Sequence, residues 1–272
     1  MKLSCQENLV DGNTFAEKVA NLEKYGFEGI ELGGDHLHSE TNRSDRRAVL
    51  ADCAVRPSSI CGGFDCEMVH CDPDRRQACI DTIKRFMDFS AEVGAAGPIS
   101  VPIFNQNLSP TIQRVPDLSP WKSQHELEIE LLTEIARDIA RHAEGVGVAL
   151  LLEPLNRYES NALKNVAEAA NICRQVGGTG VRVMADLFHM HIEEFNTPDA
   201  LENIGDVLGH VHLADNTRRE PGTGDINFKD AFTVLKRINF TGYMAFECGL
   251  TEEPNLSLPR SVNFLRNCIA EA

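Results

Sequence analysis

Short apolar runs and longer amphipathic segments alternate along the whole chain, and no other sequence feature constrains the fold as strongly. The apolar runs have the length of buried strands, and the segments between them repeat their apolar residues with the period of a helix. Strands are expected at residues 2–5, 27–32, 55–61, 98–103, 147–153, 181–186, 207–214 and 242–247. Because no linker interrupts the series, residues 1–272 are expected to form one domain.

The helices are bounded by residues that commonly begin or end them. Gly26 and Gly94 are suited to helix ends, and Pro73 is suited to a first turn. Helices are therefore expected at residues 13–25, 39–53, 72–94, 122–144, 162–176, 197–204, 228–238 and 257–270. Eight strand–helix units favour a closed α/β barrel, the (β/α)8 or TIM barrel, although open doubly wound sheets alternate in the same way. The length of 272 residues agrees with the roughly 250 typical of such barrels.

Charge and hydropathy restrict the partners of this chain. The formal net charge of −15 should repel nucleic-acid backbones and anionic membrane surfaces, so neither is expected as a partner. The N-terminal segment MKLSCQENLV lacks the apolar centre of a signal peptide, and no run reaches the roughly 18 apolar residues of a membrane helix. A cytoplasmic location is the default expectation.

The nine cysteines are expected to be reduced thiols, because the chain is large and no export signal is seen. Cys61, Cys66 and Cys71 recur beside His70 and could suggest a zinc cluster. However, no CxxC pair is present and the spacing matches no usual zinc template. A zinc cluster in this segment is therefore disfavoured.

Each of the last four expected strands runs into one side chain of a type that binds metals. These side chains are Glu153, Asp186, His212 and Glu247. Each of them alone could cap its strand or pair with an arginine, but the ends of parallel barrel strands meet at one mouth, where barrel enzymes place their chemistry. Three carboxylates and one imidazole suit Mn2+, Mg2+ or Co2+ and can also hold Zn2+. One divalent metal ion is the expected cofactor.

The segments LLEPLNRYE, VMADLFHM, HVHLADNTRREPGTG and YMAFE resemble the signature blocks of the sugar isomerase and epimerase family with a xylose-isomerase-like barrel. Within that family they are most similar to the tagatose and psicose 3-epimerases. The resemblance implies that Glu153, Asp186, His212 and Glu247 hold the metal, with Mn2+ as the expected ion. It also implies that Glu153 and Glu247 are the catalytic acid and base.

The same resemblance implies that Glu159, His189 and Arg218 bind the substrate. The expected activity is isomerisation or epimerisation of a ketose or related small carbohydrate. A metal that spans the ketose carbonyl and the adjacent hydroxyl would polarise the C–H bond and stabilise the enediolate left after proton removal. Two carboxylates on opposite faces would then remove one proton and return another.

Several other residues near the expected strand ends have two interpretations. His210 should lie one layer deeper than His212, as a hydrogen-bonded core histidine, and His191 is read as a helix-start or surface residue. Glu31 could approach the substrate or pair with an arginine. Cys5 and Cys248 could line the pocket as small apolar walls.

Two loops bear on the substrate. In PGTGDINF the paired glycines could bind an anion, but Asp225 would repel a phosphate, which favours an unphosphorylated sugar. The stretch 104–120 is long for a connector and reads as a functional loop. Together with Trp121, its Phe104 and Arg114 could form a lid over the ligand. The loop could instead contact a second subunit, which leaves a homo-oligomer open.

Three competing functions share parts of this pattern. A metal-dependent lyase, such as a dehydratase or an enzyme that cleaves 3-keto glycosides, could use the same metal and base to expel a leaving group. A hydrolase of the apurinic endonuclease type would need more histidines and a basic groove, which the charge of −15 disfavours. A non-catalytic sugar- or metal-binding module would bind the ion without exchanging substrate protons.

Overall fold

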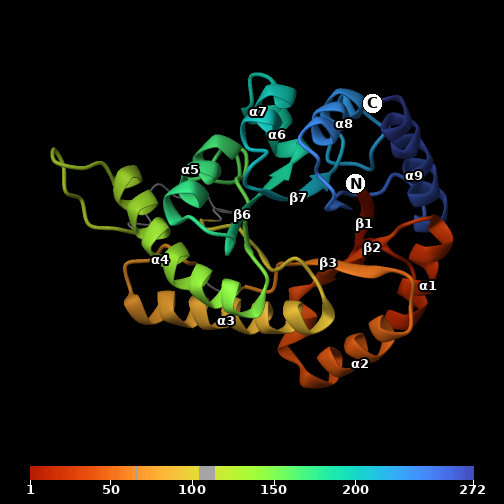
Figure 1. Cartoon of the computed structure of the whole chain (residues 1–272), viewed down its shortest axis with the longest axis horizontal. Helices are drawn as coiled ribbons and strands as arrows, with labels where there is room; N and C mark the ends of the chain where they lie inside the picture. The colour runs from red at the N-terminus through yellow and green to blue at the C-terminus, as the bar shows by residue number, and fades with distance from the viewer. Residues whose placement is uncertain (65–66, 104–113) are drawn as a thin grey trace.

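The computed structural model describes residues 1–64, 67–103 and 114–272. In these ranges eight parallel strands form one sheet in the order β3-β2-β1-β8-β7-β6-β5-β4. A parallel bridge between Ile60 and Pro98 joins the two outermost strands of that order, so the sheet curls into a nearly closed barrel. The helices lie around the barrel, with the N-terminus beside β1 and the C-terminus at the end of α9 (Figure 1). The predicted TIM barrel is confirmed.

The strands are β1 (Lys2–Gln6), β2 (Gly29–Gly33), β3 (Arg56–Cys61), β4 (Ile99–Ser100), β5 (Leu150–Leu152), β6 (Val181–Asp186), β7 (Leu208–Leu213) and β8 (Tyr243–Phe246). The α-helices are α1 (Phe15–Tyr25), α2 (Glu40–Ala51), α3 (Pro73–Val93), α4 (Gln124–Val146), α5 (Val166–Val176), α6 (Leu187–Glu193), α7 (Thr197–Asn203), α8 (Phe228–Arg237) and α9 (Pro254–Glu271). Two short 3-10 helices, η1 (Glu7–Leu9) and η2 (Gly34–His38), follow the first two strands.

The helix ends carry the capping chemistry that the sequence suggests. Ser123 and Glu126 form a reciprocal capping box at the start of α4, which satisfies two backbone donors that a helix leaves free. Gly26 and Gly94 end α1 and α3 with φ of 90° and 81°, in the left-handed conformation that glycine adopts without penalty. Pro73 occupies the first turn of α3.

The differences from the predicted elements are local. Strands β4 and β5 are shorter than their apolar runs, because only a few residues of each run are in register with a neighbouring strand. Helix α6 was not expected. It begins at Asp186, whose Oδ1 accepts a hydrogen bond from the backbone N–H of Phe188 at 2.8 Å. A strand residue that also caps a helix gives no separate start signal in the sequence.

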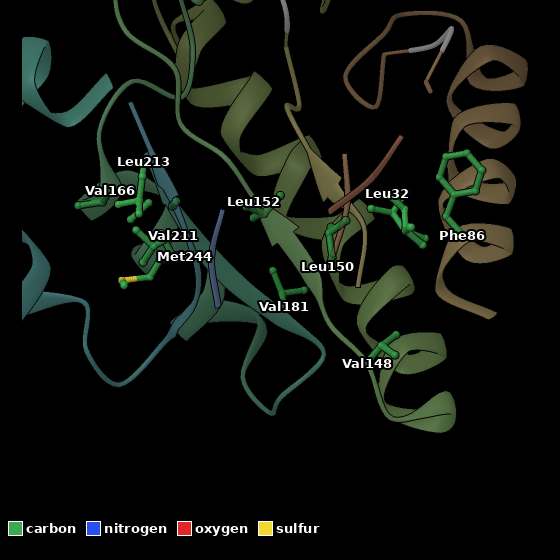
Figure 2. Packing of buried hydrophobic residues seen from close by; sticks show 14 of the residues in the cluster. Leu32, Phe86, Val148, Leu150, Leu152, Val166, Val181, Val211, Leu213 and Met244 are labelled. Carbon is green, nitrogen blue, oxygen red and sulfur yellow. The ribbon is translucent and has the colours of Figure 1, made fainter. Parts of the chain in front are cut away.

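The main apolar core lies between the sheet and the surrounding helices. Leu32 of β2 lies on the side of the sheet that faces Phe86 of α3, and Leu150 and Val181 continue the same cluster on β5 and β6 (Figure 2). Burying a side chain such as Phe86 stabilises the fold by about 1.5–3 kcal/mol. This packing fixes the strand ends that carry the site.

The loop predicted as a lid is described only from Arg114 onward, so Phe104 lies outside the described residues. Trp121 is 84% exposed. The Arg114 side chain is buried and lies 3.8 Å from a carboxylate oxygen of the buried Glu128 on α4. Arg114 is thus held against α4, and the lid over the ligand stays a prediction. No helix in the described ranges is long and apolar enough to cross a membrane.

Candidate active site

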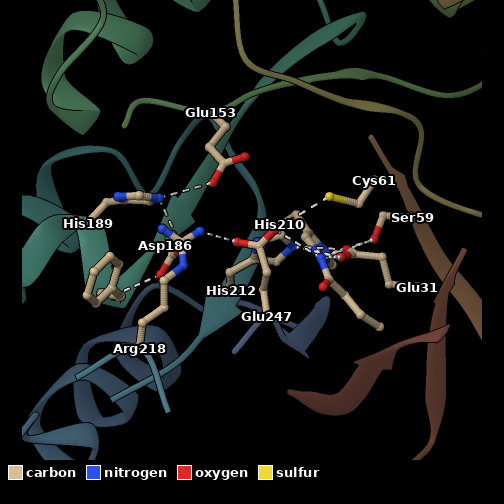
Figure 3. A network of polar contacts seen from close by, with 12 residues as sticks. Glu31, Ser59, Cys61, Glu153, Asp186, His189, His210, His212, Arg218 and Glu247 are labelled. Carbon is tan, nitrogen blue, oxygen red and sulfur yellow. Dashed lines mark hydrogen bonds and ion pairs between the residues drawn. The ribbon is translucent and has the colours of Figure 1, made fainter. Parts of the chain in front are cut away.

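The ends of the last four strands bring the predicted metal ligands together. Glu153 follows β5, Asp186 ends β6, His212 lies near the end of β7 and Glu247 follows β8. One ligand atom from each lies within 4.8 Å of every other (Figure 3). Since parallel strands deliver their ends to one mouth of a barrel, residues distant in sequence converge there.

The donor atoms of this cluster fit a divalent cation. Glu153 Oε1, Asp186 Oδ2 and His212 Nδ1 are buried and have no hydrogen-bond partner among the described residues. A buried polar atom without a partner is costly, so three such atoms close to one another form a donor set that fits a cation. Carboxylate oxygens with a single imidazole nitrogen suit Mn2+ and related ions.

Glu31 of β2 orients His212 from the opposite side of the ring. Its carboxylate accepts hydrogen bonds from Nε2 of His212 and Nε2 of His210, each at 3.0 Å, and another from the Ser59 hydroxyl. Burial alone would raise the pKa of Glu31, but the two histidines, His212 foremost, hold it well below its usual range. The proton of His212 is therefore on Nε2, which leaves Nδ1 free to bind a metal.

This arrangement settles the two interpretations given for Glu31 and His210. His210 is a fully buried, hydrogen-bonded core histidine, as predicted. Glu31 is also fully buried, and its partners are two histidines, a serine and Gln6, so the prediction of an arginine partner is wrong. The histidines come from β7, on the far side of β1 and β8 in the sheet order. They reach Glu31 only because the barrel curves.

Glu247 is surrounded by donors. Its Oε1 accepts a hydrogen bond from Gln6 Nε2 at 3.0 Å and lies 3.6 Å from Cys61 Sγ. Its Oε2 accepts one from Arg218 Nη2 at 3.1 Å. Burial would raise the pKa of Glu247, but His212 and Arg218 lower it to about 2.

Glu153, the second proposed proton-transfer group, has the opposite environment. Its side chain accepts no hydrogen bond from the described residues, and His189 Nε2 lies 3.8 Å from its Oε1. Burial, and then the neighbouring charge of Glu247, raise the pKa of Glu153 well above its usual range. Two carboxylates whose surroundings separate their pKa values form the pattern of an acid and base pair.

Two of the predicted substrate-binding residues, Glu159 and Arg218, contact each other. Arg218 donates to Glu159 Oε1 from Nη1 at 2.8 Å while its Nη2 donates to Glu247. The guanidinium lies over the Phe188 ring, 4.9 Å from its centroid. The backbone of Arg218 has φ of 55°, the left-handed region that few side chains adopt, which turns the loop after β7 toward the site.

His189, the third predicted substrate-binding residue, is held by Asn156. The Asn156 side chain and its backbone N–H donate to His189 Nδ1 at 2.8 and 3.2 Å, so the ring proton is on Nε2. That buried nitrogen lies 3.6 Å from Asp186 Oδ2 and has no hydrogen-bond partner among the described residues. It is therefore available to donate to an oxygen of a bound molecule.

A cavity of about 370 Å³ opens over these groups. Its polar lining residues include Glu153, Glu159, Arg218 and Glu247, and its other lining residues are Cys61, Gly62, Gly63, Phe64, Ile99, Val101 and Leu155. This volume lies within the range of about 300–1,000 Å³ for small-molecule sites. One half of the lining can bind hydroxyl and carbonyl oxygens, and the other presents an apolar wall.

Sequence reasoning missed Gln6, Asn156 and the role of Cys61 in this site. Asn156 lies inside the segment LLEPLNRYE, and Gln6 directly follows the first predicted strand, so position could have suggested both. Cys61 lines the cavity, whereas Cys5 and Cys248, predicted as pocket walls, are not among its lining residues. Successive side chains of a strand point to opposite faces. Cys5 and Cys248 directly adjoin Gln6 and Glu247, which point into the site, so the two cysteines point away from it.

The remaining sequence predictions resolve in the same way. His191 lies in the last turn of α6, is exposed, and sits 3.7 Å from Asp225, as expected of a surface residue. Cys66 lies outside the described residues, so the zinc alternative rests on Cys61, Cys71 and His70. Cys71 is exposed while Cys61 contacts Glu247, and the two groups that could hold a metal in the described ranges include neither cysteine.

A TIM barrel with two differently tuned carboxylates beside a candidate cation site at its mouth has the arrangement expected of an enzyme that moves protons. Comparison with known proteins specifies the family. The model of the xylose isomerase-like TIM barrel matches residues 19–268. The chain belongs to this family, and within it to the carbohydrate epimerases, as the sequence blocks predicted.

Two characterised relatives and one solved structure illustrate the relationship. A 3-dehydro-D-guloside 4-epimerase of Escherichia coli strain K12 is 29% identical over 272 residues, covering 98% of this chain and 100% of that protein. A D-psicose 3-epimerase of Ruminiclostridium cellulolyticum is 36% identical over 249 residues, covering 89% and 80%. The apo crystal structure of 3-keto-D-glucoside 4-epimerase from E. coli superposes with a TM-score of 0.86 at 28% identity, covering 98% and 100%.

Proposed function

We propose that this chain is a divalent-metal-dependent epimerase of 3-keto sugars that inverts the carbon next to the ketone. The observation that carries the proposal is the placement of Glu153 and Glu247. They stand at the ends of different strands, line the same cavity, and differ in their tendency to hold a proton. Such a pair can take a proton from one face of a bound sugar and return one to the other.

The relatives support a 3-keto sugar over a free ketose. The relative named for a 3-dehydro sugar aligns over its whole length and nearly all of this chain. Several ketose 3-epimerases align over less than half of this chain, although one covers 89%. In a 3-keto sugar, C4 is adjacent to the ketone, as C3 is in a 2-ketose. Epimerisation at C4 of a 3-keto sugar and at C3 of a 2-ketose therefore need the same kind of proton transfer.

The residues of this chain have distinct parts in that transfer. Glu247, held ionised by its donors, removes the proton next to the ketone, and Glu153 delivers a proton to the opposite face; in the reverse direction the roles exchange. His189 Nε2 and the Arg218 guanidinium can donate to the sugar oxygen where negative charge develops. Asn156 and Phe188 hold these two donors in place.

Glu153, Asp186, His212 and Glu247 would hold the metal. When bound, a divalent ion supplies positive charge that stabilises the enediolate form of the sugar. Mn2+ is the proposed ion, because three carboxylates and one imidazole provide mostly hard ligands. Metal analysis of the purified protein tests this assignment.

We also propose that the substrate is unphosphorylated. Of the described residues that line the cavity, Arg218 is the one cation, and it is already paired with Glu159 and Glu247. A phosphate would therefore find no unpaired cationic side chain in this lining.

Incubation of the Mn2+-loaded protein with methyl 3-keto-glucoside in D2O tests the function. The expected result is an intact glycoside that carries deuterium at C4 and contains the C4 epimer, as seen by NMR. Loss of methanol or water would instead support the lyase alternative. Deuterium in free ketoses but not in the 3-keto glycoside would overturn the proposed substrate class.

A further inference from the structure

A second cavity, of about 280 Å³, lies over the ends of β1 and β2 beside the catalytic cavity. The two cavities share Cys61 and Glu247 as lining residues. A molecule bound near Glu247 can therefore extend from one into the other. We call this second space the polar cavity, because its other lining residues are Gln6, Glu7, Asn8, Glu31, Leu32, Gly33, Asp35 and His36.

The charges of the polar cavity are mostly balanced within the protein. Glu7 is buried and forms an ion pair with the buried Arg46. Glu31 is paired with two histidines and Glu247 with Arg218, as described above. Asp35 has no hydrogen bond or ion pair with any described residue, so its carboxylate is free to accept hydrogen bonds from a ligand.

The chemistry of this lining selects a neutral, hydroxyl-rich ligand. The described residues that line the polar cavity include no lysine or arginine, so Asp35 would repel a phosphate or a carboxylate. They include no Phe, Tyr or Trp on which a nucleobase could stack. What they offer is carboxylate, amide and imidazole groups, which exchange hydrogen bonds with sugar hydroxyls.

The backbone fixes the polar cavity against the catalytic one. The loops after β2 and β3 pack backbone to backbone, and a Cβ added at Gly34 would lie 2.1 Å from the Gly62 carbonyl oxygen. His38 adds a hydrogen bond of 2.8 Å to the Gly63 carbonyl. The segment that carries Asp35 and His36 is thereby held beside Cys61, on the floor shared by both cavities.

We propose that the polar cavity binds the sugar or polyol unit attached to the reacting 3-keto ring, so that the preferred substrate has the size of a disaccharide. This inference rests on the proposed function and extends it. The reacting ring lies between Glu153 and Glu247, and the attached unit continues past Glu247 toward Asp35, Asn8 and His36. These three residues are exposed at the rim, where they can contact a ligand from solvent.

The test compares two substrates in the Mn2+-loaded protein: methyl 3-keto-glucoside and a disaccharide oxidised at C3 of one ring. In the double variant Asp35→Ala/His36→Ala, kcat/KM for the disaccharide should fall about tenfold, mainly through KM, because two hydrogen bonds are lost. The methyl glycoside should change less than about twofold. The control variant Asp88→Ala/His142→Ala removes an exposed acid–histidine pair between α3 and α4 and should leave both substrates unchanged.

A binding measurement decides the inference independently of turnover. Calorimetry with the unoxidised disaccharide and with methyl glucoside should show tighter binding of the disaccharide, which Asp35→Ala/His36→Ala removes and Asp35→Asn reduces. Equal losses for both ligands, or no loss for the disaccharide, would overturn the subsite. If wild type turns over neither 3-keto sugar, the proposed function fails, and the calorimetric result still decides the subsite.

Discussion

Glu31 accepts a hydrogen bond from Nε2 of His212 at 3.0 Å, and this bond turns Nδ1 of the ring toward Glu247 Oε2, 3.4 Å away. Glu31 and His212 are separated by 181 positions in the chain. A carboxylate that fixes the tautomer of a metal-binding histidine commonly influences metal affinity as strongly as a direct ligand. The predicted metal site thus depends on a residue from the opposite side of the barrel.

Replacing Glu31 should therefore weaken metal binding. In Glu31→Gln the amide still fills the space, but its NH2 group competes with the N–H donors of His210 and His212. We expect Mn2+ affinity to fall about 10- to 100-fold, as measured by calorimetry. Glu28→Gln is the matched control, because Glu28 bonds the backbone N–H of Leu3 and is not among the site residues. Unchanged affinity in Glu31→Gln would contradict the orienting role.

The two carboxylates proposed to move protons should each be indispensable. Glu153→Gln and Glu247→Gln keep the shape of the side chain but remove its ability to exchange a proton. Exchange of the sugar C–H with D2O should fall by at least about 10²–10⁴-fold in each variant, and metal binding should weaken as well. Glu193→Gln, which breaks a surface ion pair with Arg157, should retain activity. Full exchange in either site variant would defeat the two-carboxylate mechanism.

Arg218 should be irreplaceable even by lysine. Its planar guanidinium bonds Glu159 and Glu247 at once, and a single ammonium group cannot reproduce that fork. We expect Arg218→Lys to lower kcat/KM by about 100-fold, the usual effect of losing a donor at developing charge. The neighbouring Arg219→Ala, which loses only a bond to the Leu250 carbonyl, serves as the control. Steady-state kinetics of Arg218→Lys and Arg219→Ala measure the loss of kcat/KM in each variant. Equal losses would rule out a specific role for Arg218.

Metal binding should release protons and weaken in acid. The pKa values of Glu153 and His212 are both raised well above their usual ranges, chiefly by burial for Glu153 and, against burial, by Glu31 and Glu247 for His212. Raised values mean that both groups keep their protons to higher pH, and a cation must displace them. Mn2+ affinity should therefore rise with pH. Calorimetry in buffers of different ionisation enthalpy measures the released protons, and a pH-independent affinity without proton release would contradict this expectation.

A buried carboxylate outside the site offers a test of stability. Glu220 is fully buried and accepts hydrogen bonds from the Thr251 N–H and from Arg260 Nη2, each at 2.9 Å. Burial would raise the pKa of Glu220, but its hydrogen bonds, those from Thr251 foremost, lower the pKa below its usual range. The stabilisation that Glu220 contributes is therefore fully present at pH values above its pKa in the unfolded chain. It is lost as the pH falls through the pKa of Glu220 in the folded protein.

Glu220→Ala should destabilise the fold by about 1–3 kcal/mol, because the Thr251 N–H and hydroxyl and the Arg260 guanidinium lose their acceptor. Urea unfolding near neutral pH measures the difference, which should shrink in acid. The exposed Glu252, which also pairs with Arg260, provides the control variant Glu252→Ala, with an expected effect below about 0.5 kcal/mol. Equal effects of the two variants would show that burial of Glu220 is unimportant.

The strand–helix alternation and the placement of the four candidate ligands at strand ends were predictable because both are local in the sequence. A buried strand reveals itself by its apolar run, and a ligand at its end needs only the next residue to be recognised. Helix α6 was missed because Asp186 both ends a strand and caps the helix. The extent of β4 was overestimated because pairing depends on a neighbouring strand that the apolar run does not contain.

The sequence by itself determined the barrel and the family and placed the four candidate ligands at strand ends, since each depends on residue types and short spacings. Only the tertiary structure decided which groups tune those ligands. Gln6 meets Glu247 across 241 positions because β1 pairs with β8, and Glu31 meets His212 across 181 because the curvature of the barrel brings the ends of β2 and β7 together. Contacts of that kind follow from the curvature of the whole barrel, and no local pattern of side chains encodes them.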